Sequence, residues 1–170
     1  MGYTTDFEGS FKLNRTLSSE HKAYLTAFSN TRRMSRNAYK TRTRPDPLRY
    51  AVNLKVGPEG AYFVGEEGLF GQGTDADDII NYNEPPMGQP GLWCQWEPNE
   101  DGTCIQWDGG EKFYHYIEWL EYLIEHFLKP WKYRLNGRVT WSGELHGDIG
   151  TIIVENNCVR TVEGAHLRTA

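Results

Sequence analysis

The chain has 170 residues, of which 38% are hydrophobic and 24% are charged. This balance excludes a collagen, a coiled coil and a wholly disordered chain. The length predicts a single domain over residues 1–170. The net charge of −5 is unevenly distributed, because residues 31–50 carry +6 whereas residues 66–125 carry fourteen carboxylates against one lysine, a balance of −13. Extended nucleic-acid binding along the chain is therefore not expected, and a basic partner or a local anion site fits this pattern.

The sequence also bears on the cellular compartment. No run of about 18 apolar residues is present, so no membrane span is expected. The first residues lack the basic and then apolar regions of a signal peptide. The three cysteines, Cys94, Cys104 and Cys158, are too few and too widely spaced for a disulfide framework. These features predict a cytoplasmic protein.

The first half of the chain predicts one strand and one long helix. Apolar and polar residues alternate over residues 3–13, which is typical of a half-buried strand. Ser18 has the character of an N-cap, and the apolar spacing after it predicts a helix over about residues 19–36. Prolines make residues 37–60 irregular, and residues 61–64 resemble a short strand.

A long Gly- and Pro-rich loop is expected over about residues 65–91, which hold six glycines and three prolines. The glycines have neither Walker spacing nor a Gly-x-Gly-x-x-Gly pattern that opens a helix, so they indicate turns rather than a phosphate loop. Asp75, Asp77 and Asp78 lack the further ligands of a calcium loop, and they favour a solvated turn.

The second half predicts a hairpin, a helix and a meander. Residues 92–97 and 103–108 resemble two strands joined by a turn. Asp108 has capping-box spacing with Glu111, which predicts that a helix begins there and continues to Pro130. Alternation and turn residues then predict strands up to about residue 162. The fold class is α+β, with an antiparallel sheet of hairpins and a C-terminal meander on which two helices pack.

Three stretches resemble a family of small bacterial and phage proteins to which no activity is assigned: residues 2–7 (GYTTDF), 88–96 (GQPGLWCQW) and 107–114 (WDGGEKFY). The resemblance spans nearly the whole chain and carries over no catalytic residue. It implies a cytosolic setting and an origin in a phage or mobile element. By analogy with small phage proteins that inhibit host machinery, it suggests a protein that acts by contact with a host macromolecule.

Two groups of residues are candidates for that contact. The hairpin tryptophans offer large aromatic anchors, and helical spacing places three carboxylates on one ridge of the second helix. A partner with a basic surface, an unknown host protein, fits such carboxylates. The candidate partner-binding residues are Trp93, Trp96, Trp107, Glu118, Glu121 and Glu125.

The basic segment supports an alternative function, a nucleotide- or phosphate-binding domain. Arginine side chains hold phosphates through charge-assisted hydrogen bonds, and the glycine-rich loop would close over such a ligand. The candidate phosphate-binding residues are Arg32, Arg33, Arg36, Arg42, Arg44 and Arg49.

Enzyme chemistry has weaker support, because the sequence contains no recognisable catalytic motif. Glu144, His146 and Asp148 alternate, so on a strand they would point the same way and form a hydrolase or metal site. Gly143 and Gly147 indicate a turn there instead. The sequence therefore favours a non-enzymatic binding protein with no metal and no cofactor.

Overall fold

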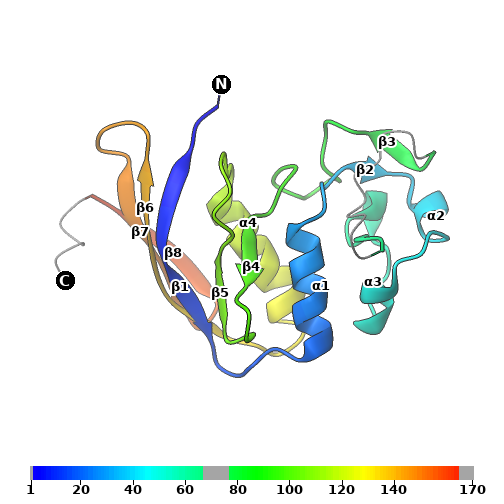
Figure 1. The fold of residues 1–170 in the computed structure, drawn as a ribbon, viewed down its shortest axis with the longest axis horizontal. Coiled ribbons are helices and arrows are strands. Elements are labelled where there is room, and N and C mark those ends of the chain that lie inside the picture. The colour runs from blue at the N-terminus through cyan, green and yellow to red at the C-terminus, as the bar shows by residue number, and fades with distance from the viewer. Residues whose placement is uncertain (1, 67–76, 165–170) are drawn as a thin grey trace. The chain divides into compact units, whose positions relative to one another are not determined.

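The computed structural model describes residues 2–66 and 77–164. The chain forms two compact units, whose helices and strands are drawn in Figure 1. Unit 1 comprises Met1–Leu17 and Gln95–Ala170, and unit 2 comprises Ser18–Cys94. The single domain over residues 1–170 stays a prediction, because two compact units can still fold cooperatively.

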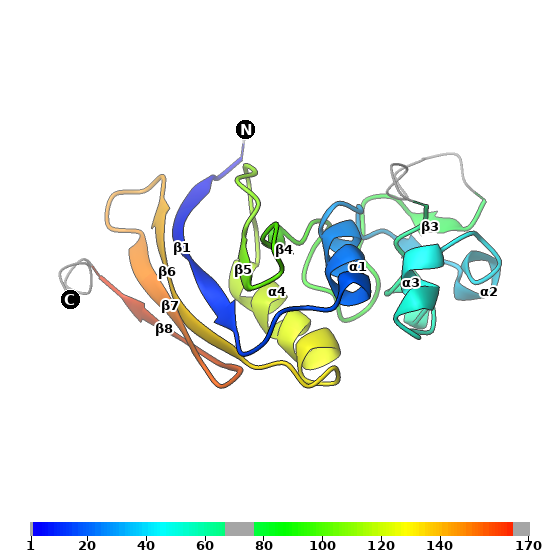
Figure 2. The same cartoon turned by 60° about the horizontal axis from the view of Figure 1, so that its bottom comes forward.

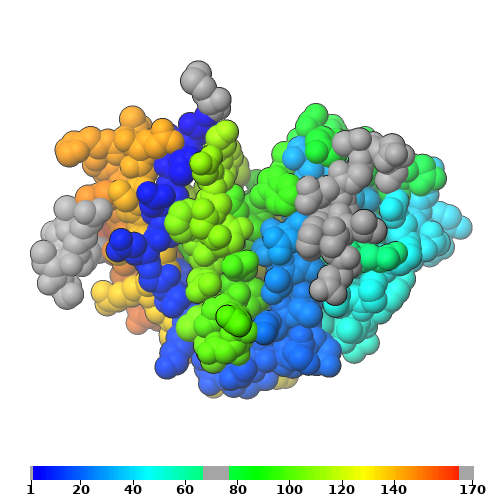
Figure 3. All heavy atoms as spheres, in the orientation of Figure 1, coloured from blue at the N-terminus to red at the C-terminus, as the bar shows by residue number. Residues whose placement is uncertain are grey.

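Unit 1 contains an antiparallel sheet of six strands in the order β4-β5-β1-β6-β7-β8. The first strand of the chain lies in its centre, because β1 pairs with β5 on one side and with β6 along its whole length on the other. The space-filling view shows β1 (blue) between the β6–β7 hairpin (orange) and the β4–β5 hairpin (green) (Figure 3). The strand bounds are β1 Thr5–Leu13, β4 Trp96–Pro98, β5 Cys104–Trp107, β6 Leu135–Gly143, β7 Ile149–Glu155 and β8 Cys158–Glu163.

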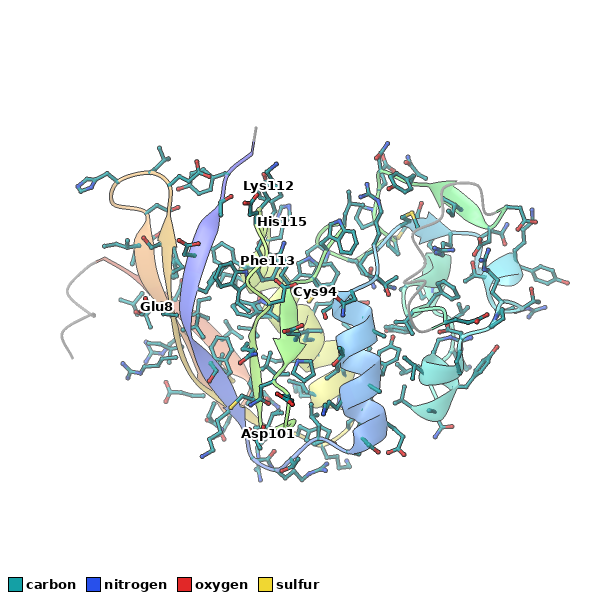
Figure 4. The ribbon with its side chains drawn as sticks, viewed as in Figure 1. Glu8, Cys94, Asp101, Lys112, Phe113 and His115 are labelled. Atoms are coloured by element: carbon teal, nitrogen blue, oxygen red, sulfur yellow. The ribbon has the colours of Figure 1, made fainter. Side chains whose placement is uncertain are left out.

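The two faces of this sheet differ sharply, as the alternation over residues 3–13 predicts. The inner face carries Phe7 and Phe11, which are buried in an aromatic cluster with Trp96 and Phe113. Helix α4 (Tyr116–Leu123) lies on this side of the sheet, as both ribbon views show (Figures 1 and 2). The outer face carries the polar residues of β1, and in Figure 4 Glu8 lies on the side of β1 away from Phe113. Burial of the inner aromatic face is what holds the sheet and helix together.

One close approach on the inner face depends on a glycine. Gly150 of β7 is paired with Trp141 of β6, and the indole ring lies over the glycine. A Cβ atom at position 150 would lie 2.2 Å from the Cη2 atom of Trp141. The buried Trp141 ring thus covers a site that only glycine can occupy without a shift.

The second long helix begins later than the sequence predicts. Asp108 accepts a hydrogen bond from the Gly110 amide at 2.8 Å, but no helix follows, because Gly109 and Lys112 adopt left-handed backbone angles. Helix α4 starts only at Tyr116, after a third left-handed residue, His115. It continues directly into a π-helical turn, η2 (Ile124–Leu128). The apolar residues Leu120, Ile124, Phe127 and Leu128, which recur at helical spacing, are buried along α4 and η2, whereas Tyr116 and Ile117 are half-buried.

Unit 2 contains helix α1 (Ser19–Ser29), which Ser18 caps as predicted by accepting from the His21 amide at 3.1 Å. The helix is shorter than the expected 19–36. The side chains of Ser29, Asn30 and Thr31 hydrogen-bond back to carbonyls of the last turn, and the chain then enters strand β2. Such local side-chain bonds compete with helix continuation.

The rest of unit 2 consists of short elements: β2 Ser35–Arg36, α2 Ala38–Thr41, α3 Pro47–Ala51, η1 Pro58–Gly60 and β3 Ile79–Asn81. Strand β2 pairs with β3, which interrupts the loop expected over residues 65–91. The strand expected over residues 61–64 does not form. Its amides have no sheet partner, and those of Val64 and Gly65 donate to the carboxylate of Asp46 instead.

The fold class is α+β, as the sequence predicts. The hairpin of β4 and β5 and the meander of β6, β7 and β8 are both present. Within residues 2–66 and 77–164, no helix is long and apolar enough to cross a bilayer.

Candidate functional site

The outer face of the sheet in unit 1 is open. It carries exposed acidic side chains at one end, and the exposed bases Lys12 and Arg138 lie further along β1 and β6 on the same face. Asp6 and Glu8 project from β1 on this face, and the pairing of β1 with β6 places Ser142 and Thr140 opposite them. These residues, with part of Trp141, line a hollow of about 450 Å³. Two carboxylates beside two hydroxyl-bearing side chains make a surface that accepts hydrogen bonds from a cationic ligand group.

A second hollow adjoins the first at the connection between β6 and β7. It measures about 680 Å³ and is lined by residues 142–147 together with Ile149 and Gly164. Ser142 lines both hollows, so the open region extends from β1 to the β6–β7 connection. We refer to the two together as the outer hollows.

Hydrogen bonds of the N-terminal residues fix the β6–β7 connection. The Tyr3 hydroxyl donates to Asp148 Oδ2 at 2.6 Å and accepts from the Leu145 amide at 2.9 Å. Trp141 Nε1 donates to Asp148 Oδ1 at 3.0 Å. Both carboxylate oxygens of Asp148 thus accept hydrogen bonds. The hydrogen bond from the Tyr3 hydroxyl to Asp148 is the main cause that raises the pKa of Tyr3. This network shapes the rim of the second hollow.

The structure does not place Glu144, His146 and Asp148 on one strand, as the hydrolase alternative requires. Glu144, His146 and Asp148 lie in the turn between β6 and β7, so they do not alternate along one strand. Glu144 accepts from the Thr4 amide, and Asp148 belongs to the network around Tyr3. Among the residues with described placement, no group of three or more His, Cys, Asp or Glu side chains is arranged to hold a metal ion.

The acidic character continues onto the β4–β5 hairpin. Glu97 lies on β4 opposite Gln106, and Asp108 follows β5 directly. Burial raises the pKa of Glu97, and the charge of Asp108 raises it further. Burial is also the main cause that raises the pKa of Asp108. Two carboxylates that are partly shielded from water and lie near each other repel when both are ionised. A cationic group bound beside them would relieve this repulsion.

The three candidate tryptophans do not form one exposed surface. Trp96 is 1% exposed, packs edge-on against Phe7 and Phe11, and donates from Nε1 to the Tyr116 carbonyl at 2.8 Å. It is a core residue, out of reach of a partner in this fold. Trp107 is half-buried beside the same cluster, and Trp93 is half-buried in unit 2. Contact of Trp93 and Trp107 with a partner stays a prediction.

The three candidate glutamates lie on one exposed ridge of α4 and η2, as their spacing predicts. Glu118 and Glu121 are exposed on α4, and Glu125 is exposed on η2. Glu125 is partly neutralised, because its Oε1 atom lies 3.0 Å from Lys129 Nζ. Since α4 covers the inner face of the sheet, the ridge and the outer hollows are separate surfaces of unit 1.

The candidate arginines lie in unit 2, and a buried aspartate binds two of them. Asp78 is 1% exposed; its Oδ2 accepts from Arg36 Nη1 and from Thr41 Oγ1, each at 2.8 Å, and its Oδ1 accepts from Arg44 Nη1 at 2.9 Å. Burial acts to raise the pKa of Asp78, but these hydrogen bonds and the two positive charges outweigh it and lower the pKa. The solvated turn expected around Asp78 is therefore wrong at this residue, and Asp75 lies outside the described residues.

Two further arginines are occupied inside unit 2. Arg49 is 4% exposed and pairs with the buried carboxylate of Asp46. Arg33 is 2% exposed and donates from Nη2 to the Ala61 carbonyl at 2.7 Å. A small phosphate ligand cannot reach side chains that are buried in this way, so Arg33, Arg36 and Arg49 do not form the predicted phosphate site.

The remaining candidates are partly or wholly at the surface. Arg32 is half-buried and donates from Nε to the Tyr82 carbonyl at 3.0 Å. Arg42 is exposed, and the Arg44 side chain retains 41% exposure despite its bond to Asp78. The basic run thus divides into arginines that build the interior of unit 2 and arginines that remain available to a ligand.

No protein-family model, curated protein or solved structure matches this chain. The resemblance to bacterial and phage proteins stays a prediction. A proposed function therefore depends on the surfaces and contacts described above.

Proposed function

We propose that this protein is a non-enzymatic cytosolic binding protein that contacts a basic surface of a host macromolecule through the outer hollows. The observation that carries the proposal is the open acidic hollow on β1 and β6, where Asp6 and Glu8 are exposed beside Thr140 and Ser142. Lysine and arginine side chains of a partner would find both charge and hydrogen-bond acceptors there.

The charge of the unit supports this choice of partner. The stretches that make up unit 1 contain 14 carboxylate and 9 Lys or Arg residues, a balance of −5, whereas unit 2 contains 9 of each and is neutral. A unit with this excess attracts basic surfaces at long range and accelerates their association at low salt. The phosphate-ligand alternative has less support, because half of its candidate arginines are buried.

Charge reversal tests the proposed surface. We expect Asp6→Lys with Glu8→Lys to weaken binding to the partner by about tenfold or more, because like charges across an interface are strongly unfavourable. The matched control is Glu118→Lys with Glu121→Lys, which makes the same change of charge on the ridge of α4. The partner would be isolated from bacterial lysate with the unaltered protein, identified by mass spectrometry, purified, and titrated against each variant by isothermal calorimetry.

The two pairs of variants separate the two acidic surfaces. Loss of affinity confined to the Asp6 and Glu8 variant supports the outer hollows. A loss confined to the Glu118 and Glu121 variant assigns the contact to the ridge and contradicts the proposed site. Equal loss in both variants indicates attraction to the net charge of the unit alone, and it contradicts a defined site as well.

Glu97 does not line the outer hollows but lies on β4, two strands from β1. We expect the contact to extend onto it, and its raised pKa then predicts how binding depends on pH. A basic partner attracts only the ionised carboxylate, so affinity should fall as the pH drops through the pKa of Glu97. Burial and Asp108 hold that pKa above the ordinary value of 4.5, and the loss therefore begins at a higher pH than for an ordinary glutamate. In a Glu97→Gln variant, calorimetric titrations at decreasing pH should show the loss starting at a lower pH. Identical profiles would exclude Glu97 from the contact.

A further inference from the structure

Unit 2 exposes two tyrosines on its short helices α2 and α3. Tyr39 of α2 is 72% exposed and Tyr50 of α3 is 53% exposed, which sets them apart from the buried aromatic residues Tyr24 and Phe28 of α1. Both short helices belong to the compact region drawn in cyan in Figure 1. Exposure to this extent leaves an aromatic ring available for stacking against a ligand.

An arginine lies against each of these rings. The Cζ atom of Arg42 is 4.2 Å from the ring centroid of Tyr39, and the Cζ atom of Arg49 is 4.6 Å from that of Tyr50. The Tyr50 hydroxyl also donates to the Arg42 carbonyl at 3.5 Å, so the two tyrosines adjoin the same residue. Stacked guanidinium groups hold the rings in place and add positive charge over one face of each ring.

The positive charge at this surface is not cancelled by the nearby buried aspartates. Asp46 pairs with the buried Arg49, and Asp78 is shared between the buried Arg36 and the half-exposed Arg44. Asp78 with its two arginines therefore has a net charge of +1. Arg44 is the member of this group that reaches the surface. Exposed Lys40 and Arg42 add two further positive charges. The exposed Asp77 is an acidic neighbour of Lys40, whose Nζ lies 3.5 Å from the Asp77 carbonyl, and it offsets one of these charges.

We propose that Tyr39, Lys40, Arg42, Arg44 and Tyr50 form a binding surface for a short single-stranded stretch of nucleic acid. Bases would stack on the open sides of the two tyrosine rings, and phosphates would be contacted by Lys40, Arg42 and Arg44. Single-stranded nucleic acid is favoured over an acidic protein because two exposed rings flank three cations in the chain here, and every base offers a flat face to a ring. A duplex hides those faces in its stack.

This surface goes beyond the proposed function, because it lies in unit 2 and takes a ligand of opposite charge. The surface consists of five residues on and beside the short helices α2 and α3, so only a short stretch of strand is expected to bind. The surface therefore agrees with the expectation that nucleic acid does not bind along the whole chain.

Fluorescence anisotropy of the full chain tests the proposal, with labelled oligothymidylate and oligouridylate of roughly 4 to 16 nucleotides as probes. We expect saturable binding at low salt. The affinity should increase with oligonucleotide length only over the shortest probes and then stay constant. Tyr39→Ala and Tyr50→Ala should each weaken binding about tenfold, the scale of one stacked base, whereas Tyr39→Phe should retain it. Arg42→Ala should reduce the slope of log affinity against log salt by about 0.7, as expected for one lost phosphate contact.

A matched control comes from unit 1. Tyr114 is 48% exposed and lies outside the surface, so Tyr114→Ala should leave the affinity for the probes unchanged. Circular dichroism melts of all variants establish that they are folded. Absence of binding at low salt overturns the proposal. A second pattern also overturns it: the Arg42 variant loses affinity for the probes, the tyrosine variants do not, and polyglutamate competes as well as the oligonucleotides. That pattern describes a surface for acidic polypeptides. Equal affinity for a duplex of the same length overturns it too.

Discussion

Replacement of Asp78 by asparagine is expected to lower the free energy of unfolding of unit 2 by about 3–5 kcal/mol. The side chains of Asp78 and Arg36 are 0% and 3% exposed, so loss of the carboxylate leaves the Arg36 guanidinium buried without its counter-charge. Asparagine keeps only one of the two acceptor oxygens and places an NH2 group where the other stood. Either Arg36 and Thr41, which bond to Oδ2, or Arg44, which bonds to Oδ1, therefore faces a donor instead of an acceptor. Hydrogen exchange of the amides of residues 35–49, measured together with urea unfolding at pH 7, reports the loss in the unit that contains the change.

An exposed ion pair provides the control for Asp78. The side chains of Arg160 and Glu155 are 57% and 68% exposed, with 3.2 Å between Arg160 Nη2 and Glu155 Oε1. Glu155→Gln should cost about 0.2–1 kcal/mol at most, because solvent screens such pairs. A cost for Asp78→Asn no larger than this would show that the buried cluster contributes little to stability.

The same change should alter how stability depends on pH. The pKa of Asp78 is lowered in the folded protein, so its contribution is complete above the ordinary value of 3.8 and is lost as the pH falls through the lowered pKa. The difference between the unaltered protein and Asp78→Asn should therefore be constant near neutral pH and should shrink only in strong acid.

Replacement of Gly150 by valine is expected to destabilise unit 1 by about 3 kcal/mol, at the upper end of the cost of overpacking a core. The new Cβ atom would lie 2.2 Å from the Trp141 ring, which is 5% exposed and is held by its bond to Asp148. The ring has to leave its position or the strands have to separate. Thermal unfolding should show a fall in Tm of roughly 6–12 °C for a chain of this size.

Gly147 is the matched control in the adjacent turn. A Cβ atom there meets nothing within 4 Å, although the backbone has a φ of +89° that disfavours side chains. Gly147→Ala should cost about 1–2 kcal/mol through this conformation alone. A double change of Gly150→Val with Trp141→Leu should be less destabilising than the sum of the single changes, because the smaller side chain removes the clash. Additive costs would contradict the steric explanation.

The parts of the fold that depend on local patterns could be predicted from the sequence. Strand β1, the β4–β5 hairpin and the meander after residue 135 follow from a period of two and from turn residues, which act between near neighbours. The start of α4 could not be predicted, because the capping-box spacing after Asp108 also suits a turn. There the chain buries Phe113 in the aromatic cluster and accepts left-handed angles at Lys112 and His115.

The candidate sites were less accessible to sequence reasoning, for a related reason. Six arginines in a run suggest an anion site, but the carboxylate that binds Arg36 and Arg44 comes from residue 78, across 42 and 34 residues of chain. No local pattern distinguishes an arginine that faces solvent from one that faces a distant aspartate. Asp6 and Glu8 could have been found from the alternation of β1, since their outward position follows directly from it.

The central position of β1 has a consequence for how the protein is made. The strand is synthesised before unit 2 and before the rest of unit 1, yet its pairing partners β5 and β6 lie about 100 and 130 residues later, and residues 18–94 of unit 2 come between them. Unit 2 is continuous and can fold as soon as it is synthesised, whereas β1 must wait with Phe7 and Phe11 unburied until β6 is complete. The slow closure of this long loop makes nascent unit 1 the part of the chain most in need of protection by chaperones.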